Sequence, residues 1–122
     1  MGRYDKYDPK AGGFRAPLEA DWLADDVNTV IGVGLNASGH VVKGAGQTGV
    51  VGILLLTKVR RAGEVVDVMT AGEVTDVDLT AGTAYAVANA DGALGTTGDV
   101  YVGHTVESSR LVVRLETGRS LA

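Results

Sequence analysis

Cysteine is absent from this 122-residue chain, which excludes disulfide bonds and thiolate metal ligands. Long apolar runs are absent as well, since the longest, from Val50 to Leu56, has seven residues including Gly52. A membrane-spanning helix needs about 20 apolar residues, so we expect the chain to have no membrane partner. The first residues lack the apolar segment of a secretory signal.

Positive charge is also scarce. Lys and Arg number 11 against 15 Asp and Glu, which gives a formal net charge of −4. Proteins that bind nucleic acid concentrate positive charge on their surface, so we expect no nucleic-acid partner. The length fits one domain, and a hydrophobic content of 45% excludes a fully disordered chain.

Short runs rich in Val, Ile, Leu and Thr alternate with glycine-containing turns from Val27 onward. In the last run, Leu111, Val113 and Leu115 alternate with charged residues, which is typical of an antiparallel sheet packed over one core. We therefore predict an all-β fold, with a single small β-barrel or sandwich-like domain over residues 27–122. The pattern predicts about eight strands, near residues 27–35, 40–43, 50–59, 64–70, 73–79, 83–89, 99–106 and 109–117.

Residues 1–26 have a different composition, which predicts an extended N-terminal arm. Both prolines and four of the six aromatic residues lie within the first 22 positions. No period of 2 or 3.6 runs through residues 1–16, and Pro17 fits the first position of a short helix over residues 17–26. Disordered tails are poor in aromatic residues, whereas interfaces are rich in them.

We therefore predict that the arm binds a partner through five residues. These are Tyr4, Tyr7, Phe14, Arg15 and Trp22. The alternative is that the arm docks onto its own β domain, because either arrangement buries aromatic surface.

Candidate chemical groups are few. Gly44 to Gly49 fits the dinucleotide-binding pattern G-x-G-x-x-G, but the residues that follow read as a strand rather than the required helix. The two histidines, His40 and His104, lack metal-ligand spacing. Asp76 and Asp78 fit a solvent-exposed strand face, and no serine lies in a nucleophile elbow. We expect no catalytic residue, no metal and no cofactor, and therefore no enzyme activity.

Two segments carry a family resemblance: Gly46–Leu55, which reads GQTGVVGILL, and Ala62–Val74, which reads AGEVVDVMTAGEV. They resemble the small decoration (cement) proteins that bind the capsids of tailed bacteriophages. The resemblance implies a structural protein on the outer surface of the virion that stabilises the phage head. It also implies the major capsid protein as partner and a homotrimer on the capsid, with an arm like the capsid-contacting arms of that family.

Two other functions remain open at this point. The first is a β-barrel module of a virion or cell surface that binds a ligand or carbohydrate. Such a module is expected to expose clustered aromatic residues, and only Tyr85 and Tyr101 lie beyond the arm. The second is an enzyme that uses the glycine-rich loop, which requires a helix after Gly49.

Overall fold

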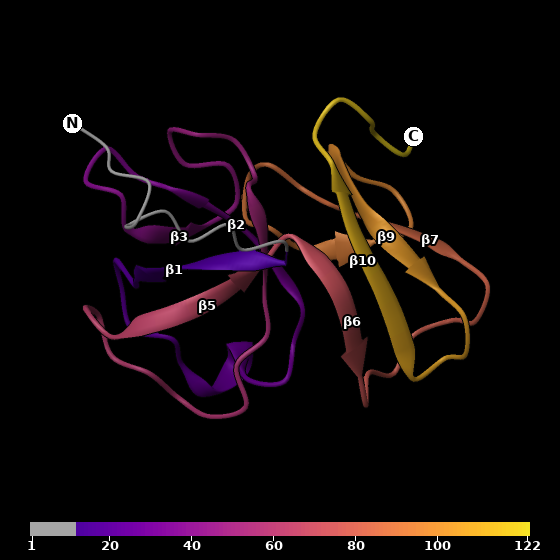
Figure 1. Ribbon diagram of the computed structural model, residues 1–122, viewed down its shortest axis with the longest axis horizontal. Coiled ribbons are helices and arrows are strands. Elements are labelled where there is room, and N and C mark those ends of the chain that lie inside the picture. The colour runs from indigo at the N-terminus through magenta and orange to yellow at the C-terminus, as the bar shows by residue number, and fades with distance from the viewer. Residues whose placement is uncertain (1–11) are drawn as a thin grey trace, which may run out of the picture.

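The computed structural model describes residues 12–122, which form two five-stranded antiparallel sheets (Figure 1). The N-terminal sheet has the order β1-β5-β4-β2-β3 and contains β1 (Gly13–Pro17), β2 (Ile31–Leu35), β3 (Val41–Lys43), β4 (Gly52–Leu54) and β5 (Val65–Met69). The C-terminal sheet has the order β6-β10-β9-β7-β8 and contains β6 (Ala71–Thr75), β7 (Ala84–Val87), β8 (Leu94–Gly95), β9 (Val100–Thr105) and β10 (Arg110–Glu116).

The all-β prediction is confirmed, and of its two forms the sandwich-like one fits. Each sheet stays open and the two do not close into a barrel. Thr70 alone separates β5 from β6, so the chain passes from one sheet to the other within a single residue. In Figure 1 the two sheets lie side by side, with β1, β2, β3 and β5 in one and β6, β7, β9 and β10 in the other.

The C-terminal sheet has the alternation that the sequence predicts. On β10, Leu111 and Val113 are buried and Arg114 is exposed. The side chains of Leu111 and Val113 point inward and meet residues of the N-terminal sheet, including Ile53 of β4, in one cluster that we call the inter-sheet core. Its buried members are Val30, Val50, Ile53, Val74, Tyr85, Val87, Val100, Val102, Leu111 and Val113.

A second cluster covers the other face of the N-terminal sheet, and we call it the Trp22 core. Its members are Ala16, Leu18, Trp22, Ile31, Val33, Val41, Leu54, Leu56, Val66 and Val68. Ile53 and Leu54 are neighbours in sequence but belong to different cores, because successive side chains of a strand point to opposite faces. The expectation of one core is therefore wrong. The sequence does not reveal the second core, because a strand that is buried on both faces has a continuous run of apolar residues without alternation.

Part of the expected arm is a strand of the N-terminal sheet. β1 pairs antiparallel with β5, from Gly13 opposite Met69 to Pro17 opposite Val65. Its five residues begin with glycine and end with proline, so little of the usual strand composition marks it.

The expected helix over residues 17–26 is wrong except for a 3₁₀ turn at η2 (Ala24–Asp26). The backbone N–H of Leu18 donates to the Glu64 carbonyl, and that of Trp22 donates to the Arg60 carbonyl. These groups therefore pair with the loop before β5 and not within a helix.

The glycine-rich segment from Gly44 to Gly49 forms a loop that leads into β4 and not into a helix. The dinucleotide-binding context is therefore missing. Gly44, Gly46 and Gly49 have φ angles of 81°, 55° and 82°, a left-handed conformation that glycine adopts at little cost. A Cβ at Gly44 would lie 2.4 Å from the carbonyl oxygen of Asn89, so this glycine also allows close approach of the chain before β8.

Candidate binding surfaces

Trp22, one of the predicted partner-binding residues, lies inside the chain's own core. Its side chain is 2% exposed, and its Nε1–H donates to the Asp26 carbonyl at 3.2 Å. The Lys43 ammonium lies 5.2 Å from the centre of the ring, within cation–π range. The ring therefore covers one face of the N-terminal sheet, as the self-docking alternative expected for the arm.

The other predicted arm residues do not form one surface. Phe14 is half-buried against the Trp22 core. Arg15, its neighbour on β1, is exposed, and its Nε lies 2.9 Å from Asp67 Oδ1 on β5. Tyr4 and Tyr7 lie outside the described residues. Partner binding through this set stays a prediction.

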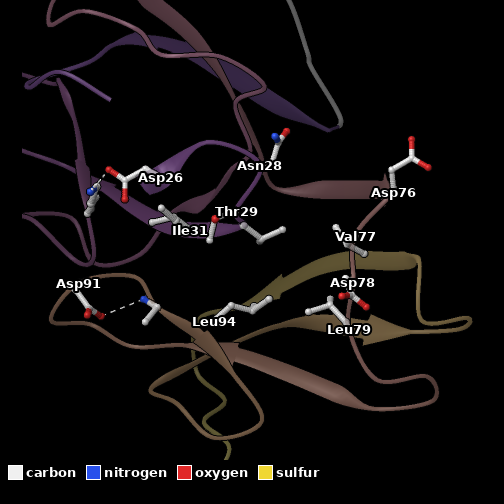
Figure 2. Close-up of a pocket in the computed structure, with 13 residues that line it drawn as sticks. Asp26, Asn28, Thr29, Ile31, Asp76, Val77, Asp78, Leu79, Asp91 and Leu94 are labelled. Atoms are coloured by element: carbon white, nitrogen blue, oxygen red, sulfur yellow. Dashed lines mark hydrogen bonds and ion pairs between the residues drawn. The ribbon is translucent and has the colours of Figure 1, made fainter. Parts of the chain in front are cut away.

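A cleft of about 620 Å³ lies between the two sheets (Figure 2). Four segments separated in the sequence line it: the chain leading into β2, the end of β3, the chain after β6 and the chain around β8. Its lining combines four aspartates with aliphatic side chains. The lining residues are Asp26, Asn28, Thr29, Val30, Ile31, Lys43, Asp76, Val77, Asp78, Leu79, Asp91, Ala93 and Leu94.

The four carboxylates of the cleft differ in their partners. Asp26 forms an ion pair with Lys43, and Asp91 Oδ1 accepts the N–H of Ala93 at 3.0 Å within its own turn. Asp76 and Asp78 are exposed, and neither forms an ion pair or side-chain hydrogen bond with another residue of the described range 12–122. One side of the cleft therefore carries negative charge that no described cation neutralises.

The strand expected over residues 73–79 ends at Thr75, although both aspartates are exposed as that expectation required. Asp76 has a φ of 61°, which interrupts the strand. The cleft could not be predicted from the sequence, because its lining comes from four separate segments. The available signal was the pattern Asp-Val-Asp-Leu, in which exposed carboxylates alternate with half-buried aliphatic residues.

A second surface lies next to Trp22, and we call it the Leu23–Val59 surface. Trp22 and Arg60 form an antiparallel bridge, with N–O distances of 2.8 and 3.0 Å. The residues beside this bridge, Leu23 and Val59, are 60% and 57% exposed, and both border one concave region with Arg60 and Arg61. Exposed apolar side chains that adjoin arginine are common in protein interfaces.

The remaining candidate groups lie apart. His40 precedes β3 of the N-terminal sheet, whereas His104 is exposed on β9 of the C-terminal sheet. Among residues 12–122, no group of three or more His, Cys, Asp or Glu side chains is placed to hold a metal ion. Within the same range, no helix is long and apolar enough to cross a membrane.

Comparison with known proteins gives a likeness in fold. No protein-family model matches the sequence, and no curated protein matches it. A solved chain from Mycobacterium phage Patience superimposes with a TM-score of 0.77 and 22% sequence identity, and the match covers 93% of this chain and 96% of that chain. This chain therefore shares its fold, over nearly its whole length, with a protein of a bacteriophage.

Proposed function

We propose that this chain is a structural bacteriophage protein that decorates the outer surface of the capsid and stabilises the shell. The observation that carries the proposal is the likeness in fold to the phage chain, which leaves little of either chain unmatched. The resemblance of Gly46–Leu55 and Ala62–Val74 to decoration proteins supports the same function. The proposal assigns no reaction to the chain.

The physical demands on a decoration protein are a rigid body, protected sheet edges and an adhesive surface. The two cores provide the rigid body. Two of the edge strands, β3 and β8, have only three and two residues, which limits pairing with unrelated chains. The Leu23–Val59 surface supplies exposed apolar area, and we propose that it contacts the major capsid protein together with the arm.

We further propose that the chain forms a homotrimer on the capsid, as the family resemblance implies. A closed ring of three copies is a cyclic arrangement in which one surface of each copy contacts a different surface of the next. Contacts that are weak in solution become stable when the capsid brings the copies together, because binding shifts association by mass action.

Co-sedimentation with capsids from phage that lack the gene for this chain tests the proposal. We expect the full chain to sediment with these capsids, and Leu23→Asp with Val59→Asp to reduce the bound fraction strongly. The matched control is Val106→Asp, because Val106 is also exposed, at 46%, but lies in the turn between β9 and β10. Electron microscopy of decorated capsids then counts the copies at each site. A full chain that leaves the capsids bare would contradict the function, and isolated single copies would contradict the trimer.

Removal of residues 1–11 tests the contribution of the first part of the arm. The first described strand begins at Gly13, so we expect the shortened chain to fold and melt like the full chain. We also expect it to bind capsids more weakly, with a modest dependence on salt, because aromatic burial is screened less than charge pairing. Unchanged capsid affinity would show that the folded domain alone carries the contact.

A further inference from the structure

We propose that the cleft between the two sheets binds an extended segment of a partner protein that carries lysine or arginine next to aliphatic residues. The proposal rests on three features of the cleft, namely its aliphatic floor, an unpaired stretch of backbone and its charge. It does not depend on the proposed function, because the partner is defined only by its chemistry.

The floor of the cleft is apolar but incompletely covered. Val77, Leu79 and Leu94 pack against the inter-sheet core, yet each remains half-buried and lines the cleft. In Figure 2, Val77 and Leu79 lie on the chain after β6, and Leu94 lies beside them on the same side of the cleft. An aliphatic side chain placed on this floor would bury apolar surface on both partners, which favours binding.

The backbone along the same segment is half-paired. The N–H groups of Val77 and Leu79 donate to the carbonyls of Ser109 and Ser108, at 3.2 and 2.9 Å. The N–H and carbonyl of Asp78, which lies between them, make no hydrogen bond with another residue of the described range. A donor and an acceptor on one residue are the groups that an added extended segment uses when it pairs with a sheet edge.

The charge of the cleft selects the occupant. Four aspartates and one lysine line it, so its formal charge is −3. Lys43 already pairs with Asp26, which leaves Asp76 and Asp78 available on the segment that also offers the free backbone. A segment with Lys or Arg beside its aliphatic residues would complement both, whereas an acidic segment would be repelled.

Titration with two synthetic peptides, followed by amide NMR signals of the full chain, tests the proposal. The probe is acetyl-Gly-Lys-Val-Lys-Leu-Gly-amide, and its comparison peptide replaces both lysines with glutamate. We expect the lysine peptide alone to shift the amides of Asp78, Leu79 and Leu94 and to slow hydrogen exchange at Asp78. Equal shifts with both peptides, or lysine-peptide shifts that spare these amides, would overturn the proposal.

The variant Asp76→Asn with Asp78→Asn isolates the role of charge. Asparagine tolerates the positive φ of residue 76, so this variant keeps the backbone. We expect it to weaken binding of the lysine peptide by about tenfold or more, because it removes both carboxylates that would contact the lysines. The control, Asp67→Asn with Glu116→Gln, changes the net charge equally outside the cleft and should bind normally. Equal affinity of the variant and the control would overturn the proposal.

Two other occupants are distinguishable in the same spectra. If residues 1–11 of this chain fill the cleft, Arg3→Gln with Lys6→Gln and Lys10→Gln will shift the Asp78 and Leu94 amides before any peptide is added. If a second copy fills it, those amides will shift with protein concentration alone. Either result would overturn the partner segment as occupant.

Discussion

The N-terminal sheet is covered on both faces, whereas the C-terminal sheet is covered on one. The first face of the N-terminal sheet meets the inter-sheet core, and its second face is closed by Trp22 and Leu18. The C-terminal sheet instead exposes Glu73, His104 and Arg114 on its outer face. One sheet therefore depends on apolar coverage by the segment that links β1 to β2, and the other combines one apolar face with polar contacts at its hairpins.

Trp22→Ala tests the coverage of the N-terminal sheet and should have the largest effect. The substitution removes a large side chain that is 2% exposed and leaves a cavity in the Trp22 core. We expect the free energy of unfolding to fall by about 3–5 kcal/mol, measured by urea denaturation. Leu23→Ala is the matched control, because the adjacent Leu23 is 60% exposed. A loss for Trp22→Ala no larger than that control would contradict the role of the ring as a cover.

The difference between the sheets also explains how far the sequence could predict the fold. The alternation of Leu111 and Val113 with charged residues is local, so β10 could be predicted from it. β1 could not, because Phe14 and Ala16 form a strand only where β5 offers its free edge. The existence of two cores could not be predicted from the sequence either. The continuous apolar run around Ile53 and Leu54 does not show which of these side chains faces which side of the sheet.

The candidate surfaces were harder to predict than the strands. Asp76 and Asp78 could be recognised as exposed from the pattern around them. Their cleft depends on the chain before β2 and the chain around β8, which the fold brings together from about 50 and 15 residues away in sequence. The aromatic content of the first 22 residues identified Trp22 as unusual, but burial in the chain's own core and burial in an interface require the same composition.

Gly32→Ala tests the contact between the two sheets. A Cβ on Gly32 of β2 would lie 2.5 Å from Cγ2 of the buried Val87 on β7. We expect a loss of about 1–3 kcal/mol from overpacking, measured by urea denaturation. Gly118→Ala is the control, because nothing lies within 4 Å of that Cβ. The double variant with Val87→Ala should lose less than the sum of the two single variants, and strict additivity would contradict a direct clash.

Thr105→Val tests a polar contact of the C-terminal sheet. Thr105 is 2% exposed. Its hydroxyl donates to the Thr80 carbonyl and accepts the Thr83 N–H at 3.0 Å. Valine keeps the shape but leaves both backbone groups unpaired, so we expect a loss of about 1 kcal/mol. Thr105→Ser keeps the hydroxyl and should retain these bonds. If the serine variant unfolds more readily than the valine variant, the methyl group of Thr105 contributes more to stability by packing than its hydroxyl does by hydrogen bonding.

Glu107→Gln should have the smallest effect, because it changes an exposed contact of the β9–β10 hairpin. The Arg110 guanidinium donates to both carboxylate oxygens of Glu107 at 2.9 Å and to Glu73 at 3.0 Å. The hydrogen bond from Arg110 lowers the pKa of Glu107 below its ordinary value of 4.5. A carboxyl whose pKa is lower in the folded state stabilises the fold above its unfolded pKa and loses that contribution as the pH falls through the folded pKa.

The pH dependence follows from this direction. At neutral pH the native chain should melt slightly above Glu107→Gln. The gap should close as the pH falls below 4.5, because protonated glutamate and glutamine then present the same neutral group to Arg110. Melting temperatures of both chains from pH 7 to pH 3 measure the gap, and an NMR titration of Glu107 measures its pKa directly. A gap that persists at pH 3 would show that glutamine alters the hairpin by shape and not by charge.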